Sequence, residues 1–502
     1  MAELVPGSLA RLTTRAFQEY ERTQSIFTLP SRKFAQPDGR HDTSVAIHGR
    51  RAGTPLGPAA GPHTQMAQNI VLSWLAGARI IELKTVQVLD SIRVPRPCIE
   101  TRQAAWNVEW SQELRIEQSL EEYVKASMLI DMLAHLLGRE RECLFDMSVG
   151  YELDGISSDR MRAFMRGMMD ARSTVDALRS QIPDKWRHLR DLDFTTNIAP
   201  SVTLSAFHGC PPGEIEEIAD FVMAEIGLDC TIKLNPTLLG RAAVDEILHG
   251  RLGFDDVQVP PSAFDNDPDW NAAVAIVANL QARARELGRS FAVKLTNTLI
   301  VENRSEFLPR TERFAYLSGP PLHVLAMHLV HRFRSAFGTA LPISFSAGID
   351  RSNYPDAVRL GLAPVTVCTD LLKQGGYGRL QGYATELGQR MDAAGATTIG
   401  EFLAPGEIGT YVDSLDRYAR YRNDPRHPPK KTGRLLTRAT CSECDLCIGV
   451  CPNAAIFTML PHRIAIIDGW CNDCGNCETF CPDVGAPYRV KPRVSIDETP
   501  WI

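Results

Sequence analysis

The chain reads CSECDLCIGVCP over residues 441–452 and CNDCGNCETFCP over residues 471–482. Both stretches have the spacing C-x2-C-x2-C-x3-C-P, which is the [4Fe–4S] ligand pattern of bacterial two-cluster ferredoxins. In those domains the fourth cysteine of each run binds the cluster of the other run. The spacing therefore predicts two clusters with crossed ligand sets. One set is Cys441, Cys444, Cys447 and Cys481, and the other is Cys471, Cys474, Cys477 and Cys451.

A pair of four-cysteine zinc sites is the alternative to the clusters. Zinc sites seldom use eight cysteines in two identical runs that each end in proline, so the pattern favours iron and sulfur. The other five of the 13 cysteines are scattered through the rest of the chain, and an odd, scattered set does not fit a disulfide framework. The cysteines indicate electron transfer but do not identify a substrate.

Composition limits the class of protein. The chain has 502 residues, 44% of them hydrophobic, which is enough for one large core and a small second domain. The net charge of −6 offers no basic surface of the kind that nucleic acids require. The sequence contains no run of eighteen apolar residues, and its N-terminal segment lacks the apolar stretch of a signal peptide. We therefore expect a cytoplasmic protein with neither nucleic acid nor membrane as a partner.

Short apolar segments alternate with helical ones between residues 43 and 390. Strands that are apolar on both faces belong to parallel sheets covered by helices. Their repeated alternation with helices predicts either a (β/α)8 barrel or a doubly wound sheet, both in the α/β class. The longest helix is predicted over residues 111–138, with Gly138 as its stop. The strand candidates are ARIIELKTV, CLFDMSVG, SVTLSAF, CTIKLNP, SFAVKLTN, LPISFSAG and APVTVCTD.

Lysines and small polar residues close three of the predicted strands. A lysine in this position is costly to bury without an anion, so three converging lysines indicate a phosphate, a carboxylate or an anionic ring such as a reduced flavin. The alternative is that they pair with acidic residues such as Glu82 or Glu152, as lysines in structural ion pairs do. The residues concerned are Lys84 and Thr85, Lys233 and Asn235, and Lys294, Asn297 and Thr298.

Two glycine-containing segments, SFSAGID and VCTDLLKQGGYG, follow predicted strands. Bare backbone N–H groups in such loops can bind a phosphate, although the same loops also serve ordinary turns. The sequence contains neither G-x-G-x-x-G nor a P-loop, so we do not expect this chain to bind NAD(P)H by itself.

The predicted domains follow from these patterns. The proline-rich, charged segment YRNDPRHPPKKTGR predicts a linker over residues 421–434. Residues 1–42 are expected to form an N-terminal extension, residues 43–420 the large α/β domain, and residues 435–502 a ferredoxin-like domain.

The segment LGPAAGPHTQMAQNIVLSWLAGARIIELKTVQ resembles the first flavin-binding segment of the dihydroorotate and dihydropyrimidine dehydrogenase barrels. The stretches GPAAGPHTQ, IELKTVQ, HGCPP, KLNPTLLG and KLTNT are more similar to the bacterial YgfK type, a family described as selenate reductase subunits. This resemblance covers nearly all of residues 15–390 and implies a TIM barrel that holds FMN. It places Ala59, Ala60 and Gly61 at the ring, Lys84, Thr85, Lys233, Asn297 and Thr298 at its polar edge, and Gly319, Ala347, Gly348, Cys368 and Thr369 at the phosphate.

The chain departs from the dehydrogenase pattern at two positions. Ala206 stands where those barrels carry a cysteine that transfers a proton, and Glu152 stands where they carry an asparagine that contacts the substrate. Ser205, His208 and Cys210 are the nearby candidates for proton transfer, and His208 is preferred because histidine titrates near neutral pH. Alternatively, His208 fixes a loop and Cys210 is a small buried apolar residue. These departures count against pyrimidine or dihydroorotate chemistry, although the enzyme is still expected to be an oxidoreductase of the dihydropyrimidine/dihydroorotate dehydrogenase-like type.

Chains of the YgfK type also carry an FAD and NAD(P)H module that resembles the small subunit of glutamate synthase. We expect a separate reductase subunit to supply it, in a hetero-oligomer. The leading hypothesis is an oxidoreductase in which this partner, the two clusters and the FMN pass electrons to a small substrate such as an N-heterocycle. The alternatives are a non-catalytic electron-transfer or scaffold subunit, which Ala206 and Glu152 favour, and a ferredoxin-reducing subunit of a bifurcating complex.

Overall fold

The computed structural model describes residues 4–36, 39–91, 93–102, 104–108, 111–205, 212–415, 419–423, 431–460 and 463–495. Its central sheet has eight parallel strands in the order β5-β16-β15-β12-β11-β10-β9-β6, so neighbouring strands follow one another along the chain. The two end strands meet where the N–H of Arg79 donates to the carbonyl of Leu56 at 2.9 Å. This confirms the TIM-type barrel and excludes the doubly wound sheet. The strands are β5 (Leu56–Pro58), β6 (Ile80–Glu82), β9 (Leu144–Val149), β10 (Ser201–Leu204), β11 (Asp229–Leu234), β12 (Phe291–Leu295), β15 (Ile343–Phe345) and β16 (Val365–Val367).

The seven predicted strand segments each overlap one barrel strand, but β5 was not predicted as a strand. Its sequence, Leu-Gly-Pro, contains two residues that are rare in strands. Gly57 is required by packing, because a Cβ at this position would lie 1.6 Å from the carbonyl oxygen of Ile80. The closure of the barrel, rather than local preference, makes this segment a strand.

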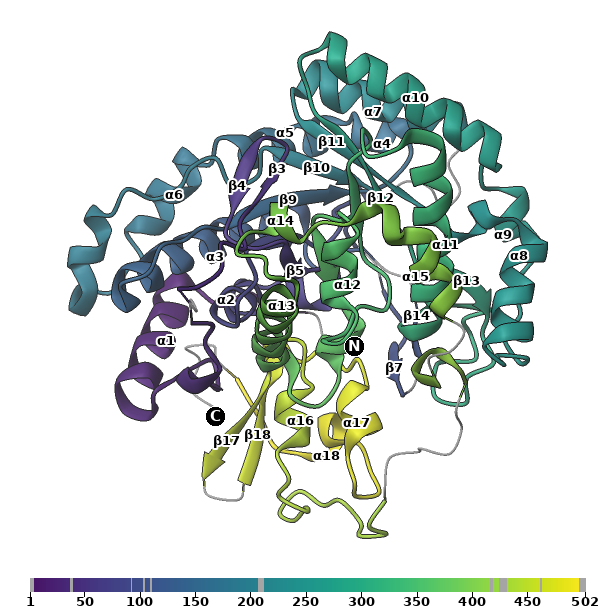
Figure 1. Cartoon of the computed structure of the whole chain (residues 1–502). Coiled ribbons are helices and arrows are strands. Elements are labelled where there is room, and N and C mark those ends of the chain that lie inside the picture. Colours follow the sequence, from purple (N-terminus) through teal and green to yellow (C-terminus); the bar gives the residue numbers. More distant parts are fainter. Residues whose placement is uncertain are drawn as a thin grey trace.

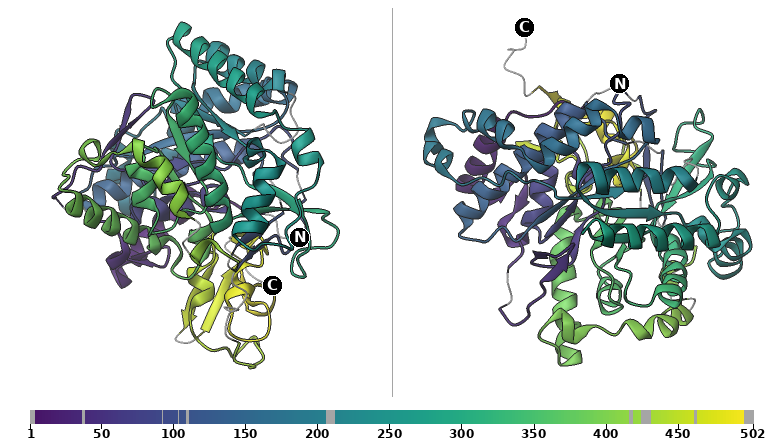
Figure 2. Two further views of the ribbon diagram at one scale, coloured as in Figure 1. Left: turned by 45° about the vertical axis from the view of Figure 1, so that its right-hand side comes forward. Right: turned by 90° about the horizontal axis from the view of Figure 1, so that it is seen from above.

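Helices surround the strands (Figures 1 and 2). The longest, α3 (Ile116–Leu137), starts five residues later than predicted, and it ends at Gly138, which has a φ of +60° as its predicted role as a stop requires. The other outer helices are α2 (Ala67–Leu75), α7 (Pro212–Phe221), α10 (Trp270–Glu286), α11 (Pro320–Phe337), α12 (Tyr354–Arg359) and α13 (Leu380–Ala394). Shorter or peripheral helices are α1 (Leu9–Thr23), α4 (Leu153–Ile156), α5 (Asp159–Met169), α6 (Arg172–Arg179), α8 (Arg241–Asp245), α9 (Ser262–Asp265), α14 (Ile399–Phe402) and α15 (Ile408–Ser414).

Small sheets flank the two ends of the barrel. At the starts of the strands, the hairpin β3 (Val45–Ile47) and β4 (Arg50–Ala52) is held by Arg50, which pairs with Asp229 at 2.7 Å. At their carboxyl ends an antiparallel sheet has the order β13-β14-β8-β7. Its strands are β7 (Ile99–Thr101), β8 (Ala105–Asn107), β13 (Leu299–Glu302) and β14 (Phe314–Ser318), and a separate hairpin joins β1 (Ser25–Ile26) to β2 (Leu29–Pro30).

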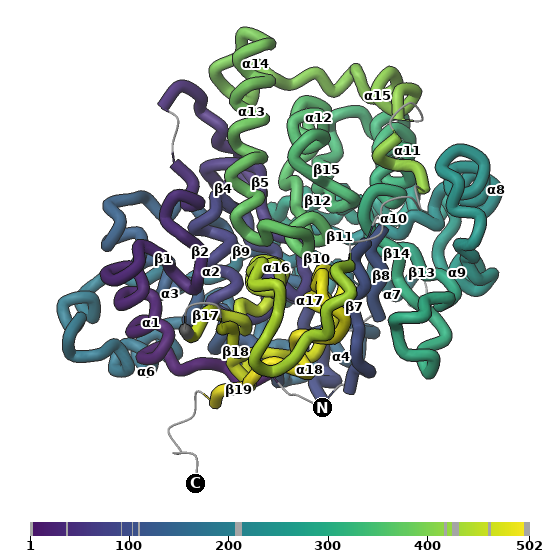
Figure 3. The backbone as a smooth tube through the Cα atoms, turned by 90° about the horizontal axis from the view of Figure 1, so that it is seen from below, coloured from purple at the N-terminus to yellow at the C-terminus, as the bar shows by residue number. Residues whose placement is uncertain are grey.

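The cysteine-rich segment lies in front of the barrel strands in the view from below (Figure 3), and its helices α16 (Leu446–Gly449) and α17 (Asn476–Phe480) lie on the side next to the barrel in Figure 1. Close backbone approaches join the two parts, because a Cβ on Gly376 would lie 2.0 Å from the carbonyl oxygen of Gly449. Buried side chains of both parts belong to one continuous core. The segment comprises α16 (Leu446–Gly449), β17 (Ile456–Leu460), β18 (Arg463–Ile467), α17 (Asn476–Phe480), α18 (Pro487–Val490) and β19 (Arg493–Val494).

The predicted linker is only partly described, since residues 424–430 lie outside the described ranges. Tyr421, at its predicted start, is buried and stacks on His323 with ring centroids 5.2 Å apart. Within the described ranges, no helix combines the length and the apolar character needed to cross a membrane.

Candidate active site and iron–sulfur sites

A cavity opens at the carboxyl ends of the barrel strands, where enzymes with this fold carry their sites. Its empty volume is about 1070 Å³, including the space at its mouth. Ser205 lines it, and so does every residue that the family resemblance places at FMN. These are Ala59, Ala60, Gly61, Lys84, Thr85, Lys233, Asn297, Thr298, Gly319, Ala347, Gly348, Cys368 and Thr369.

The three predicted lysines differ in their surroundings. Lys84 and Lys233 line the cavity, and their charges lower the pKa of Cys368, although burial outweighs them and raises it to about 11. Lys294 is buried instead in an ion pair with Glu82 and donates to the hydroxyl of Thr366 at 2.9 Å. The prediction that three lysines face one ligand is therefore wrong for Lys294, for which the ion-pair alternative holds.

Glu82 remains ionised inside the barrel. Burial raises the pKa of its carboxyl group, but the nearby charges of Lys294 and Lys233 outweigh burial and lower the pKa below its ordinary value. The carboxylate also accepts a hydrogen bond from the N–H of Ala60 at 3.1 Å. Glu82 therefore ties the cavity segment that contains Ala60 to the barrel core.

A chain of hydrogen bonds orients the amide of Asn297. The carboxylate of Asp267 can only accept, so the side-chain amide of Asn235 donates to it, at 2.8 Å. The oxygen of Asn235 then accepts from the amide of Asn297 at 2.7 Å. This leaves the side-chain oxygen of Asn297 toward Ser205, whose hydroxyl donates to it at 3.5 Å. The cavity therefore presents an acceptor and a hydroxyl side by side.

Two glycine loops meet at the other end of the cavity. Gly319 has a φ of +84° and Gly348 a φ of +52°, in the left-handed region that favours glycine. A Cβ on Gly348 would lie 2.3 Å from the carbonyl oxygen of Gly319. Near them, the hydroxyl of Thr369 lies 3.1 Å from that of Ser318. Bare backbone and two hydroxyl groups therefore gather at this end.

His323 supports the Ala347–Gly348 loop from behind. Its Nδ1 donates to the carbonyl of Ala347 at 2.9 Å, and because a carbonyl only accepts, this nitrogen carries the proton. Its Nε2 accepts from the hydroxyl of Tyr411 at 3.0 Å. Burial lowers the pKa of His323 to about 4, so the ring is neutral at neutral pH. No motif in the sequence marked these residues.

The structure describes only one of the three residues predicted to transfer a proton. Ser205 lines the cavity, whereas His208 and Cys210 lie outside the described residues. Glu152 is exposed at the start of α4.

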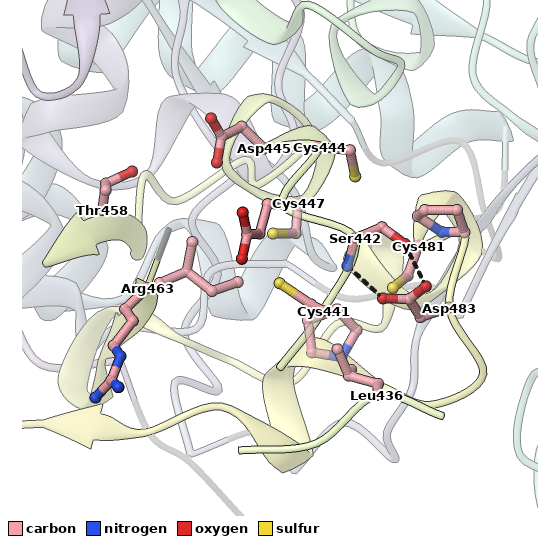
Figure 4. A pocket seen from close by; sticks show the side chains of 14 residues that line it. Leu436, Cys441, Ser442, Cys444, Asp445, Cys447, Thr458, Arg463, Cys481 and Asp483 are labelled. Atoms are coloured by element: carbon pink, nitrogen blue, oxygen red, sulfur yellow. Dashed lines mark hydrogen bonds between the residues drawn. The ribbon is translucent and has the colours of Figure 1, made fainter. Parts of the chain in front are cut away.

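The first predicted set of cysteines surrounds a pocket of the cysteine-rich segment (Figure 4). Cys441, Cys444, Cys447 and Cys481 all line it, and Cys444 is exposed to solvent. The N–H of Ser442 donates to Asp483 at 2.7 Å, which joins the loop of the first run to the end of the second. We refer to these four cysteines as the outer site.

Three cysteines of the second predicted set, Cys471, Cys474 and Cys477, are buried, and Cys451 is partly buried. Burial raises the pKa of the thiol groups of Cys474 and Cys477 well above the ordinary value, and the neighbouring Cys451 and Cys471 raise it further. Cys451 from the first run is therefore a neighbour of Cys474 and Cys477, as the crossed ligand set requires, and it also neighbours Cys447 of its own run. We refer to these four cysteines as the inner site.

Among the residues that the structure describes, no three His, Cys, Asp or Glu side chains converge closely enough to hold a single ion.

The inner site is hydrogen-bonded to the wall of the barrel cavity. The carbonyl of Cys474 accepts from the N–H groups of Cys98 and Ile99, both at 3.0 Å. The side chain of Asn476 donates to the carbonyl of Leu372 at 2.8 Å. Ile99 and Leu372 both line the cavity, so a single residue separates the inner loop from the cavity at each contact.

A buried carboxylate adds a second connection between the inner cysteine loop and the barrel domain. Glu113 forms an ion pair with Arg96, and it accepts from Gln65 at 2.8 Å and from Asn472 of the inner loop at 2.9 Å. Sequence reasoning missed Glu113 and Asn472 because polar residues in loops carry no periodic pattern.

Both parts of the chain match known families. Residues 27–407 match the model described as oxidoreductase YgfK, N-terminal TIM-barrel domain, and residues 435–491 match the 4Fe-4S dicluster domain. Over 405 residues the chain is 40% identical to the oxidoreductase YgfK of Escherichia coli K12, which covers 76% of this chain and 39% of the relative. The chain thus spans about two fifths of the length of this curated relative.

Two further similarities concern the separate parts. A 63-residue segment is 30% identical to the ketoisovalerate oxidoreductase subunit VorC of Methanothermobacter marburgensis, covering 11% of this chain and 80% of that subunit. The ligand-free DHODH structure from Eimeria tenella matches with a TM-score of 0.50 and 17% identity, over 79% of this chain and 98% of the other, which shows a shared fold. The chain therefore belongs to the YgfK oxidoreductase family, with a 4Fe-4S dicluster domain after its barrel.

Proposed function

We propose that this chain is an iron–sulfur flavoprotein oxidoreductase subunit in which two [4Fe–4S] clusters exchange electrons with FMN in the barrel cavity. The observation that carries the proposal is the direct hydrogen bonding of the inner cysteine loop to the cavity wall, through Ile99 and Leu372. A cluster at this position would lie next to the cavity, and electron transfer depends on such proximity. Electrons would come from a partner reductase with FAD and NAD(P)H sites, resembling the glutamate synthase small subunit.

The cavity fits FMN at both ends. The backbone of Gly319 and Gly348 and the hydroxyl of Thr369 offer donors for a phosphate without side-chain obstruction. At the other end, Lys84 and Lys233 supply positive charge for the anionic edge of a reduced flavin ring.

Bound FMN would supply the exchange between single electrons and a hydride pair. The chain's own residues would bind the FMN ring and orient it. Lys84 and Lys233 would hold the polar edge of the ring, the oxygen of Asn297 would accept from a ring N–H, and Ser205 would hold a proton at its hydroxyl.

The residues above the barrel strands support a small, flat substrate. Trp106 and Asn107 of β8 line the cavity, where an aromatic face and an amide suit an N-heterocycle. We propose this substrate class for the complete enzyme, with the partner subunit present.

The test measures cofactors before any substrate is known. Protein purified without oxygen should contain about eight iron atoms per chain and release FMN on denaturation, as detected by mass spectrometry. Lys84→Ala and Lys233→Ala should each weaken FMN binding about tenfold or more, which is the effect of losing a charged hydrogen bond.

The matched control is Lys185→Ala, an exposed lysine that pairs with Glu21 and does not line the cavity, and this variant should keep its FMN. Gly348→Asp is a poor variant for this purpose, because its Cβ would collide with Gly319 and disturb the fold. If protein with full iron content neither releases nor rebinds FMN, the catalytic proposal fails. A non-catalytic electron-transfer or scaffold subunit then becomes the better description.

A further inference from the structure

The two cysteine sites differ in their access to solvent. At the inner site Cys471, Cys474 and Cys477 are buried, whereas Cys444 of the outer site is exposed. Electron transfer between proteins requires the donor to approach closely, which the exposed site allows. If both sites hold clusters, as the proposed function states, electrons from another protein enter at the outer site.

Basic side chains surround the outer pocket. Lys431 donates to the carbonyl of Cys481 at 2.7 Å, and Arg434 donates to the carbonyl of Cys441 at 3.0 Å. Arg463 also lines the pocket (Figure 4) and is exposed. The hydrogen bonds of Lys431 and Arg434 fix their charges close to the cysteine loops, in a chain whose net charge is −6.

Two exposed carboxylates oppose these charges only in part. Glu443 and Asp445 line the same pocket, and Asp483 is held by Ser442. Arg438 adds a further exposed positive charge in the loop before Cys441. Among the described residues named here, Lys431, Arg434, Arg438 and Arg463 are exposed and basic, whereas Glu443 and Asp445 are exposed and acidic.

Exposed apolar side chains lie beside this charged surface. Leu435 and Val484 pair side by side, with 68% and 51% of their surfaces exposed. Their sequence neighbours Leu436 and Asp483 line the outer pocket. Apolar groups next to a basic rim are a common composition of protein docking surfaces.

We propose that Lys431, Arg434, Arg438, Arg463, Leu435 and Val484 form an entry face that docks a redox protein with an acidic surface. One electron leaves the reduced cofactor of that protein and reduces the outer [4Fe–4S] cluster by one electron, with no bond made or broken. The basic residues steer the encounter, because complementary charge raises the association rate. The inference rests on the proposed function for the presence of the cluster, but not for FMN or for a substrate.

The experiment compares two reductants of opposite charge. Fully reduced flavodoxin, an acidic protein, and the methyl viologen radical, a small cation, each reduce the anaerobic holoprotein in a stopped-flow spectrometer at low ionic strength. Arg434→Glu combined with Arg463→Glu should slow reduction by flavodoxin about tenfold or more, since steering accounts for factors of this size. Reduction by methyl viologen should not be slowed.

Salt and a remote variant supply the controls. Salt should slow the reaction of the unchanged protein with flavodoxin, because it screens charges on exposed groups. Arg172→Glu, on α6 and 75% exposed, should react like the unchanged protein with both reductants. If the double variant loses iron, Arg463→Glu alone repeats the test while leaving the contact of Arg434 intact.

Two results would overturn the entry face. One is an unchanged or faster reaction of the iron-loaded variant with flavodoxin, which would indicate a partner with a basic surface or a different approach. The other is equal slowing with both reductants, which would indicate a change in the cluster rather than in docking. Because cluster reduction is the readout, the test remains valid even if the barrel releases no FMN.

Discussion

The outer and inner cysteine sites arise from runs with the same spacing, yet their surroundings differ. Cys444 of the outer site is exposed, while the equivalent Cys474 is buried and hydrogen-bonded through its carbonyl to the cavity wall. The residue that follows each of these two cysteines also differs. Asp445 follows Cys444 with a φ of +55°, and Gly475 follows Cys474 with a φ of +89°. The spacing selects the ligands, and the environment decides which site faces a partner and which faces the barrel.

The largest difference should follow from removing one ligand at each site. Cys444→Ala and Cys474→Ala should each lower the iron content from about eight to about four atoms per chain. Only Cys474→Ala should also lower the thermal midpoint strongly, because its site is part of the contact with the barrel. Iron analysis and thermal unfolding under anaerobic conditions measure both effects.

Equal midpoints for the two variants would show that the inner site does not stabilise the domain contact. Cys451→Ala refines the same comparison, since crossed ligation predicts loss of the inner cluster rather than the outer one. Electron paramagnetic resonance distinguishes the signals of the inner and the outer cluster. Loss of the signal that disappears in Cys444→Ala would contradict the crossed assignment.

The next largest effect on stability should come from exchanging glycine and aspartate at the position that follows the second cysteine of each run. In Gly475→Asp the new Cβ would lie 2.5 Å from Pro97 and 2.9 Å from Phe307, and the carboxylate would be buried. We expect a loss of about 3 kcal/mol or more, from overpacking and an unpaired charge. Asp445→Gly, at an exposed position that also has a positive φ, should change stability by about 0.5 kcal/mol at most. Similar losses in both would mean that the two sites are equally exposed.

Acid should loosen the end of the barrel that His323 supports. The pKa of His323 in the folded protein, about 4, lies below its ordinary value because the ring is buried. The neutral ring therefore stabilises the fold fully above about pH 6.5, and this contribution of about 3 kcal/mol disappears as the pH falls toward 4.

The measurement for His323 is the thermal midpoint and the release of FMN between pH 7 and 4.5. His323→Gln cannot titrate, so its loss of stability over this range should be smaller than that of the unchanged protein. His135→Gln, at an exposed position near the end of α3, is the control and should follow the unchanged protein. Identical curves for His323→Gln and the unchanged protein would exclude this role.

The smallest expected effect on stability concerns the residue that follows the first cysteine of each run. Asn472→Ala should cost about 1–3 kcal/mol, because it leaves the buried carboxylate of Glu113 with one partner fewer. In Ser442→Ala the hydroxyl contact with Asp483 is lost, but the N–H of Ser442 and the hydroxyl of Thr432 still donate to that carboxylate, so the cost should be only about 1 kcal/mol. Denaturant unfolding of the holoprotein compares the two. A larger effect in Ser442→Ala than in Asn472→Ala would contradict this order.

The sequence by itself determined the elements whose chemistry is local. Cysteine spacing predicted the two groups of cysteines, and apolar runs predicted seven of the eight barrel strands, because ligation and burial impose short, regular patterns. The resemblance to known barrels indicated which residues would meet in the cavity. β5 was not predicted as a strand because Leu-Gly-Pro has no strand preference and pairs only when the barrel closes.

Only the tertiary structure decided which polar groups pair inside the protein. Lys294 faces Glu82 rather than a ligand, and His323 supports Ala347 from a helix far along the chain. The structure alone showed that one cysteine site is covered by the barrel while the other is open. Such contacts join residues that are distant in sequence, and their energies depend on burial and mutual geometry, which a linear pattern of residue types does not encode.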